Sequence, residues 1–391
     1  NDTMDFVGII SKDLLQKEVY YVMTLENSKY KDIKDLEGKS IGIYSSKNST
    51  KASNELNKKI KNISKEYKNV VELFEDLQDN KIDAVLINDS TKNLLSSDLS
   101  DMKLKLNEIY KVYVSIEKTD IVKVVDITKK PFNIYVAGGD AYGSIDNVTN
   151  TDVNMIITVD PINRKVLLTS IPRDYYVNLP SFGDDAYDKL THAGYYGIEE
   201  SAKAIENLLD IDINYYVKVN FKGVVGIVDA LGGVNVEVPK RLCTDNSNRQ
   251  GQVCIEKGMQ TLNGEEALVL ARNRYDLKLG DIDRGYNQQL LLKALLQKMT
   301  EVRNVNTLLE ILQTVSNNLD TNLTTEEILS FYNIFKDILA SRKYQSNDDF
   351  LNIIQIKLAG GGRKQYFSNL KANLWVYNLN EKSIKTDEYG N

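Results

Sequence analysis

The sequence contains a single histidine, His192, among 391 residues. Zinc proteases of the HExxH type and three-histidine zinc sites need more than one imidazole, so the composition excludes both. A Ser-His-Asp triad would have to be built on His192 alone. The side chains left for the chemistry of a site are therefore carboxylates, arginine, lysine and tyrosine.

Cysteine is nearly as scarce. The two cysteines, Cys243 and Cys254, flank the polar segment CTDNSNRQGQVC and are too few for a four-cysteine zinc site. They are either two reduced thiols or a disulfide that closes a surface hairpin. Closure of such a loop would contribute roughly 3 kcal/mol by the chain-entropy relation. A disulfide would also place the domain outside the cytoplasm.

Proline is scarce and unevenly distributed. There are five prolines, and all of them follow residue 130. This shift in composition supports a boundary near DITKKP, and the length of the chain suits two domains. We predict an accessory α/β domain over residues 1–125, a linker over 126–131 and a larger domain over 132–391.

The chain also lacks long apolar runs and a large excess of charge. No apolar stretch exceeds about five residues, whereas a membrane-spanning helix needs about 20. The start, NDTMDFVGII, has neither the basic nor the apolar region of a signal peptide. Lys and Arg number 49 against 55 Asp and Glu, a net charge of −6. This balance gives no overall bias toward nucleic acid.

The first region alternates apolar segments and helical patterns, which predicts a small α/β domain. The expected strands are 19–25, 41–45, 83–87 and 111–118. The segments DLEGKSIGI and NKIDAVLIND resemble one lobe of a periplasmic solute-binding fold. No ligand-binding constellation accompanies them, so the sequence favours a spacer or docking domain over a solute receptor.

The second region predicts a mixed sheet flanked by helices. Expected strands lie at 132–137, 153–159 and 165–171, and the DPINR turn makes the last two an antiparallel hairpin. We expect the segment ALVLARNRY to be extended. The segment GGGRK (360–364) lacks the ending of a Walker A phosphate loop, so we expect a turn there.

Acidic residues gather at one end of this sheet. Asp140 follows the first of these strands and Asp152 precedes the second. The antiparallel hairpin then brings Arg173 and Asp174 close to Asp152. Two aspartates and an arginine at one sheet edge suit a hard cation and a phosphate oxygen. The alternative is a solvated loop with ordinary acidic residues, which connectivity alone slightly favours.

Arginines dominate the segment ARNRYDLKLGDIDRGYNQQ. On an extended segment Arg272 and Arg274 point to the same face. Arg284 and Gln288 share a helix face if a helix begins near Asp283. Converging guanidinium groups repel one another unless they bind a polyanion, and arginine binds phosphate in bidentate fashion. The alternative is a set of weak surface salt bridges, with Asp276, Asp281 and Asp283.

Nine short blocks follow one another in a family-specific order: GGD (138–140), TDVNM (151–155), LLTSIPRDYYV (167–177), DKLTHAG (188–194), INYYVKVNF (213–221), VDALGGV (228–234), LNGEEAL (262–268), ARNRY (271–275) and GDIDRGYNQQ (280–289). In this order they resemble the LytR-CpsA-Psr family of extracytoplasmic cell-wall glycopolymer transferases. The likeness covers roughly residues 132–300. It implies an α-β-α domain of the family's type, preceded here by the smaller accessory domain.

The resemblance implies a magnesium-dependent phosphotransferase. It would move a glycopolymer, of capsular polysaccharide or wall teichoic acid type, from a polyprenyl-pyrophosphate carrier to peptidoglycan, and it would cleave the pyrophosphate. Asp281 matches the family aspartate that would act as general base. The other matched residues are Asp140 and Asp152 for the metal, and Arg173, Arg272, Arg274, Arg284 and Gln288 for the pyrophosphate, with Lys189 as a further phosphate contact. Arg173 and Arg274 would also act in catalysis.

The resemblance also implies tethering at the outer face of the membrane, by an anchor that the given sequence lacks. A carrier lipid needs a long apolar groove. Candidates to line it are Ile156, Ile157, Leu167, Ile205, Leu208, Leu209, Val217, Phe221, Val224, Val225, Val228, Leu268, Leu270 and Leu291. His192 would position its own loop.

One position departs from the family pattern. Most members carry arginine two residues before the second aspartate, whereas this chain has Asn150. Asparagine donates hydrogen bonds but carries no charge, and Arg164 or Lys189 would have to compensate for the loss. The departure supports a second reading, a weakly active or non-catalytic polyprenyl-phosphate-binding or regulatory protein. In a third reading the N-terminal lobe binds a solute and the remainder anchors it.

Overall fold

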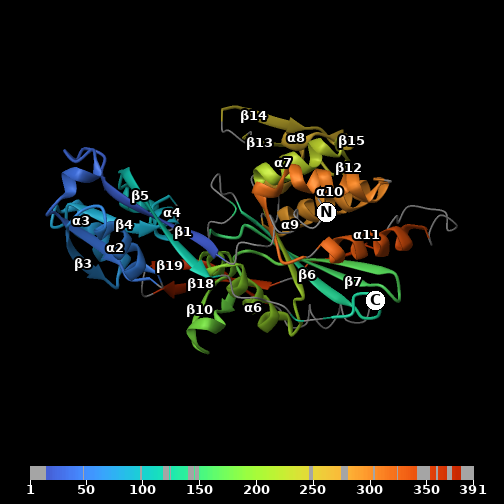
Figure 1. Ribbon diagram of the computed structural model, residues 1–391, viewed down its shortest axis with the longest axis horizontal. Coiled ribbons are helices and arrows are strands. Elements are labelled where there is room, and N and C mark those ends of the chain that lie inside the picture. The colour runs from blue at the N-terminus through green and yellow to red at the C-terminus, as the bar shows by residue number, and fades with distance from the viewer. Residues whose placement is uncertain are drawn as a thin grey trace.

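The computed structural model describes residues 15–46, 48–96, 99–117, 123, 125–139, 145, 149–245, 250–273, 281–302, 304–323, 325–340, 353–357, 360–367 and 372–379. A five-stranded sheet and a six-stranded sheet organise them. Figure 1 shows the N-terminal sheet at one end of the molecule and the larger α/β part at the other. No helix among the described residues combines the length and the apolarity that crossing a bilayer requires.

The N-terminal sheet has the strand order β3-β2-β4-β1-β5. Its strands are β1 (Leu15–Leu25), β2 (Ser40–Tyr44), β3 (Ile63–Tyr67), β4 (Ala84–Asn88) and β5 (Leu106–Glu117). β2 runs parallel to β3 and β4, whereas β1 is antiparallel to β4 and β5. The four expected strands are confirmed. β3 was not expected, because its sequence ISKEY is exposed at every position but the last and so has no apolar alternation.

Both faces of this sheet are covered. Alternation along β1 sends Tyr20 and Val22 to one face and Val19 and Tyr21 to the other. The first face packs against helix α2 (Ser49–Asn57), and we name its buried residues the α2-side cluster. The second packs against helix α3 (Val70–Gln78), and its buried residues form the α3-side cluster.

The larger sheet has the order β16-β11-β6-β7-β8-β17. Its strands are β6 (Phe132–Gly139), β7 (Val153–Asp160), β8 (Lys165–Ser170), β11 (Tyr215–Asn220), β16 (Leu319–Thr321) and β17 (Ile353–Lys357). β7 is antiparallel to β6 and β8, whereas β6 and β11 are parallel, as are β8 and β17. The mixed sheet expected from the sequence is confirmed, including the hairpin across DPINR.

Helices cover both faces of the larger sheet (Figure 1). The helices described in this part of the chain are α5 (Leu190–Ala193), α6 (Ile198–Leu209), α7 (Phe221–Ala230), α8 (Gly264–Arg272), α9 (Asp281–Glu301), α10 (Val305–Thr314) and α11 (Thr325–Ala340). Residues of α6 pack with Tyr135 and Ile156 on one face. Residues of α9 and α11 pack with Ile134 and Ile157 on the other.

Two local expectations are wrong. The segment ALVLARNRY is not extended, because its first six residues lie in helix α8, which Asn263 and Glu266 begin with a capping box. The five residues 267–271 of α8 are all buried, and an unbroken apolar run does not distinguish a buried helix from a buried strand. GGGRK is not a turn but the start of strand β18 (Gly360–Phe367), which pairs with β19 (Ala372–Leu379).

Candidate active site

The antiparallel strands bring three separate segments to one sheet edge. The register pairs Gly138 with Val153 and Met155 with Ser170. The start of β7 therefore lies beside the end of β6 and the end of β8. Arg173 Nη1 donates to Asp152 Oδ1 at 2.6 Å, so the two side chains meet as the connectivity predicts.

Asp152 accepts hydrogen bonds from two further side chains. Asn150 Nδ2 donates to its Oδ1 at 3.2 Å. Arg284 Nη2, from the first turn of α9, donates to its backbone oxygen at 3.2 Å. Arg284 is only 3% exposed, so its charge is held within the protein rather than on the surface. Asp152 is thus held by Arg173 and Asn150 through its carboxylate and by Arg284 through its backbone oxygen.

A close helix–strand contact delivers Arg284 to this place. Gly285 packs against the end of β8, where an added Cβ would lie 3.1 Å from the Ser170 Cβ. Ser170 Oγ also donates to the Gly285 carbonyl at 3.0 Å. A larger residue at 285 would push α9 outward, and Arg284 with it.

Lys189 and Asp174 extend the charged network. Lys189 Nζ lies 3.3 Å from Asp174 Oδ1, and the Lys189 side chain is only 11% exposed. Arg173 Nε lies 4.0 Å from Asp174 Oδ2. We name Arg173 and Lys189 the cationic pair. Asp174, the carboxylate that both contact, occupies a position that a phosphate oxygen can take, because guanidinium and ammonium groups bind both kinds of anion.

His192 lies in the short helix α5, in a segment that packs beside the residue before Asp152. Its Nδ1 lies 2.7 Å from Asp188 Oδ1, and Thr151 N donates to the Thr191 carbonyl at 3.2 Å. A Cβ at Gly194 would lie 2.5 Å from the Thr149 oxygen, so only glycine allows this approach. These contacts fit the predicted role of His192 in positioning its loop.

The remaining predicted residues are not all brought to this place. Asp140 and Arg274 lie outside the described residues, and Asp281 begins α9 without a described side chain. Arg272 ends α8 and donates to the Asp245 carbonyl at 3.0 Å. We expect Arg272 and Arg274 to share a face of an extended segment. This is wrong, because Arg272 lies in helix α8.

Gln288 lies four residues after Arg284 in α9, as expected for two residues that share a helix face. Its amide donates to the Ala271 carbonyl at 3.0 Å and is buried, 6% exposed. It therefore joins the end of α8 to α9. The same residue lines an apolar cavity described below.

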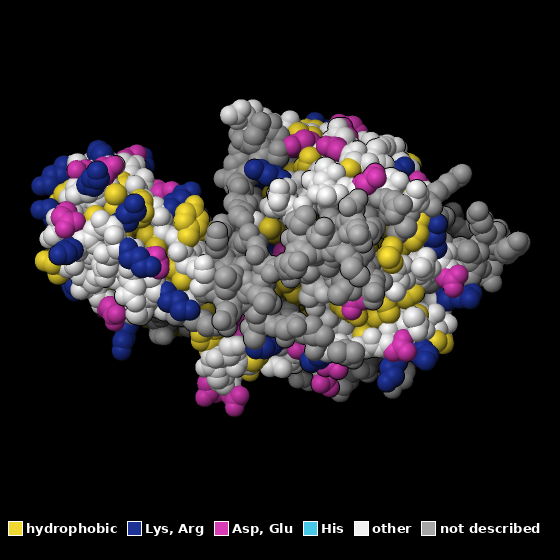
Figure 2. Space-filling view, in the orientation of Figure 1, with side chains coloured by type: hydrophobic (Ala, Val, Ile, Leu, Met, Phe, Trp, Pro, Cys, Tyr) yellow, Lys and Arg dark blue, Asp and Glu magenta, His cyan; other side chains and the backbone are white. Residues whose placement is uncertain are grey.

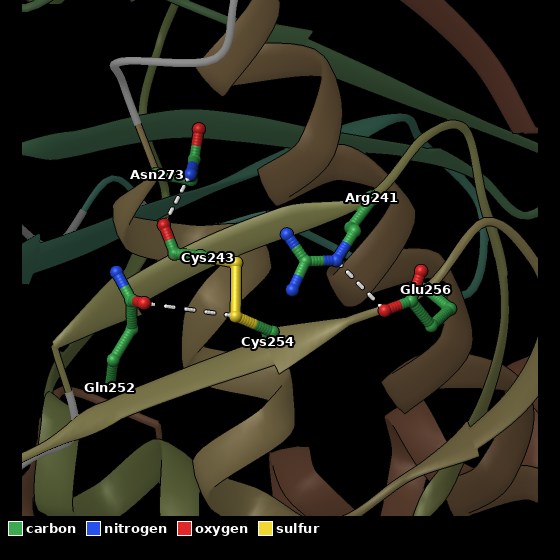
Figure 3. Close-up of a disulfide and its surroundings, with 6 residues drawn as sticks. All are labelled: Arg241, Cys243, Gln252, Cys254, Glu256 and Asn273. Carbon is green, nitrogen blue, oxygen red and sulfur yellow. Dashed lines mark hydrogen bonds and ion pairs between the residues drawn. A yellow bond between two sulfur atoms is a disulfide. The ribbon is translucent and has the colours of Figure 1, made fainter.

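A disulfide joins Cys243 of β13 (Leu242–Asp245) to Cys254 of β14 (Gln252–Ile255). Figure 3 shows Asn273, which follows α8, donating to the Cys243 carbonyl at 2.6 Å. Together with the bond from Arg272 to Asp245, this contact fixes the end of α8 on the hairpin. Sequence reasoning left the pairing of the cysteines open, because their spacing alone does not distinguish thiols from a disulfide.

Replacing both cysteines with serine is expected to lower the free energy of unfolding by about 3 kcal/mol, the chain-entropy value for a loop of about this size. Thermal melting with and without dithiothreitol measures the effect. The reductant is expected to lower the melting temperature of the native protein and to leave that of the double variant unchanged. A native protein whose melting does not respond to reductant would contradict the prediction.

An apolar cavity of about 280 Å³ lies next to Asp152. Gly138, Val153 and Gln288 line it close to that residue, and β6, β7, β11 and α9–α11 enclose the rest. Figure 2 shows hydrophobic side chains at the surface near α11 and β7. The lining thus includes close neighbours of the charged network, since Val153 follows Asp152 and Gln288 lies one helical turn after Arg284.

The expected groove is correct in part. Five of its candidate residues line the cavity: Ile157, Val217, Phe221, Val224 and Leu291. Others pack elsewhere. Ile156 of β7 packs with Ile205 of α6, and Val228 of α7 belongs to the same cluster as Leu270 of α8. The lining residues of α10 and α11 were missed, because a core and a cavity wall have the same apolar pattern.

The donor set fits a magnesium ion. In the part of the chain that the structure describes, no three His, Cys, Asp or Glu side chains gather closely enough to hold a metal alone. Magnesium does not require such a cluster, since one or two carboxylates and the oxygens of a phosphate substrate bind it. Asp152 supplies one carboxylate, and Asp140 directly follows β6.

Comparison with known proteins agrees with this geometry. A model of the LytR_cpsA_psr family matches residues 99–385. The chain belongs to this family. A second family model, described as NMT1/THI5 like, matches residues 10–134. The chain is thus a LytR-CpsA-Psr protein with an additional N-terminal domain.

Curated relatives of this LytR-CpsA-Psr chain are named polyisoprenyl-teichoic acid–peptidoglycan teichoic acid transferases. TagV of Bacillus subtilis is 34% identical over 227 residues, 56% of this chain and 57% of TagV. TagU of Bacillus mycoides is 28% identical over 267 residues, 68% of this chain and 81% of TagU. The chain thus matches little more than half the length of TagV.

Solved structures show the same fold. The crystal structure of Bacillus subtilis TagV superposes with a TM-score of 0.55 at 28% identity, over 66% of this chain and 95% of TagV. TagT bound to LI-WTA superposes with a TM-score of 0.52 at 27% identity, over 68% of this chain and 91% of TagT.

Proposed function

We propose that this protein transfers a glycopolymer from a polyprenyl-pyrophosphate carrier to peptidoglycan. The observation that supports this most is an apolar cavity lined by Val153 and Gln288, the close neighbours of Asp152 and Arg284 in the charged network. A lipid pyrophosphate is the kind of molecule that needs both, because its tail is apolar and its head is a polyanion. The names of the curated relatives support the same reaction.

In the proposed reaction a hydroxyl of a peptidoglycan sugar attacks the sugar-proximal phosphorus. The bond from this phosphorus to the bridging oxygen breaks, and polyprenyl phosphate leaves with that oxygen. Asp281 accepts the hydroxyl proton. The cationic pair and Arg284, with Arg272 and Arg274, stabilise the charge that builds on the phosphate oxygens.

Magnesium would be held by Asp152 and Asp140, and Gln288 would complete the set of proposed pyrophosphate-binding residues. When bound, the ion neutralises charge on the pyrophosphate oxygens. Arg173 and Asn150 hold the Asp152 carboxylate in one orientation. These two residues thereby fix the metal-binding carboxylate before the ion binds.

We propose that the transferred polymer is of teichoic acid or capsular polysaccharide type and that the protein works at the outer face of the cell membrane. The disulfide supports this placement, since such bonds persist in oxidising compartments. The lipid carrier supports a position close to the membrane.

The second candidate function is lipid binding without turnover, which Asn150 favours. Asn150 Nδ2 donates to Asp152 but adds no charge where most members carry arginine. Lipid binding without magnesium-dependent turnover, together with turnover gained by Asn150→Arg, would establish this function. Turnover by the unaltered chain would exclude it.

Protein purified from a host that makes polyprenyl phosphates is expected to carry one such lipid, because the cavity is apolar and its lining residues Val153 and Gln288 are close neighbours of the charged network. Native mass spectrometry measures the added mass, and fragmentation identifies the phosphate. A mass equal to polyprenyl phosphate or pyrophosphate supports the proposal. A preparation that neither carries such a lipid nor takes it up when polyprenyl phosphate is added would contradict it.

A further inference from the structure

The β18–β19 hairpin is a separate two-stranded sheet with one buried face. Its register sets Arg363 opposite Val376 and Gln365 opposite Leu374, so these residues share a face with Phe367. Val376 is 0% exposed and Leu374 is 6% exposed. A two-stranded hairpin cannot bury its own face, so another part of the chain covers it.

The N-terminal domain provides that cover. Phe367, Leu374 and Val376 belong to the α3-side cluster, together with Val19 of β1 and Leu73 of α3. Figure 1 shows the hairpin next to β1, between the two parts of the molecule. A segment near the end of the family-matched region therefore completes the core of the N-terminal domain.

The same hairpin face also contacts the larger domain at Tyr176, in strand β9 (Tyr176–Asn178). The Phe367 and Tyr176 rings meet edge to face with centroids 6.0 Å apart. The Arg363 guanidinium lies 5.3 Å from the Tyr176 ring centroid. Tyr176 also packs against the α3-side cluster, so the hairpin and both domains meet at this residue.

Tyr176 is directly connected to the cationic pair. It follows Arg173 by three residues and lies opposite Lys189 of β10 (Tyr187–Lys189). Backbone bonds join the two segments, since Thr191 N donates to the Arg173 carbonyl at 2.9 Å. A displacement of Tyr176 therefore moves both members of the pair.

The other end of this segment is electrostatically coupled to the N-terminal domain. Burial raises the pKa of the Tyr196 phenol most, and the charges of Asp188, Tyr44 and Glu18 raise it further. Tyr44 and Glu18 belong to the N-terminal sheet domain, which therefore affects Tyr196 as well as Tyr176.

We propose that the N-terminal domain positions the cationic pair of the transfer site, with the β18–β19 hairpin and Tyr176 as the connection. Tyr176 is a positioning residue, because it acts on substrate only through Arg173 and Lys189. The inference rests on the proposed function for its kinetic consequence. The mechanical connection itself stands on the packing alone.

Hydrogen exchange of the Thr191 and Leu190 amides tests the connection without any substrate. Tyr176→Ala and Phe367→Ala are expected to speed the exchange of these amides by about tenfold, because the segment loses its support. Tyr176→Phe keeps the ring and is expected to exchange at the native rate. Leu56→Ala is the matched control, since Leu56 is buried in the α2-side cluster, on the opposite face of the N-terminal sheet. Native exchange rates in Tyr176→Ala would overturn the proposal.

Kinetics with a polyprenyl-pyrophosphate-linked glycan test the consequence. Tyr176→Ala is expected to raise KM about tenfold, because misplaced cations bind the pyrophosphate less well. Partial unfolding would instead lower the apparent kcat and leave KM unchanged, which would contradict positioning. Tyr176 is only half-buried, whereas Phe367 is one of the buried residues of the α3-side cluster. Tyr176→Ala can therefore be used if Phe367→Ala does not fold. Altered exchange in a protein that never transfers glycan would refute the proposed function and retain the connection.

Discussion

Arg173→Ala is expected to lower the kcat of glycopolymer transfer by about 10²–10³-fold, the usual loss when one donor to a developing oxyanion is removed. Arg173 is half-buried at the junction of β7 and the segment after β8, and its Nη1 lies 2.6 Å from Asp152 Oδ1. Its removal would leave the pyrophosphate with less positive charge. It would also remove a contact that holds the Asp152 side chain in its orientation. The measurement is steady-state release of polyprenyl phosphate.

Arg241→Ala is the matched control for this loss. Arg241 forms an ion pair with Glu256 at 2.9 Å, and both side chains are more than half exposed. Exposed pairs of this kind contribute little to stability. The control is expected to keep native kcat and native melting. If Arg173→Ala turned over within about threefold of the native protein, the assignment of the cationic pair would be wrong.

Val136→Phe is expected to weaken binding of a long polyprenyl carrier by on the order of a hundredfold. Val136 is partly buried and lines the cavity from the central strand β6, beside Val217 of β11. The added ring would displace about four carbons of the lipid. At about 0.8 kcal/mol per buried CH₂, their loss costs about 3 kcal/mol, or roughly a hundredfold in Kd.

Two comparisons isolate this effect. Ile162→Phe adds a ring at a position that is 63% exposed in the turn between β7 and β8, and binding is expected to stay native. A carrier with a very short tail is expected to bind Val136→Phe and the native protein equally, because it does not enter the cavity. Equal affinity of both proteins for the long carrier would show that the lipid lies elsewhere. Titration with the long and the short carrier phosphate in detergent micelles measures all five affinities.

The sequence predicted the sheet edge at Asp152 because connectivity alone determines it. An antiparallel hairpin leaves no other place for Arg173, and the structure puts the two side chains in contact. Arg284 was recovered for a similar reason, since a strong helical pattern follows it. Each of these inferences needed only the local hydrophobic periodicity and the direction in which the chain runs.

What the sequence could not predict depends on contacts between distant segments. The helix α8 was taken for an extended segment, because all of residues 267–271 are apolar and buried whichever way they fold. The lipid cavity and the core have the same apolar residues, so a composition pattern does not separate Ile157 from Ile156. The hairpin's contact with the N-terminal domain joins residues more than 300 positions apart, such as Val19 and Val376.

The most direct test is transfer itself. The native protein is incubated with a polyprenyl-pyrophosphate-linked glycan, peptidoglycan fragments and magnesium, and the lipid and glycan products are identified by mass spectrometry. We predict that polyprenyl monophosphate accumulates while a phosphodiester joins the glycan to a peptidoglycan sugar. Carrier that stays intact, or is released as polyprenyl pyrophosphate, would contradict the proposed reaction.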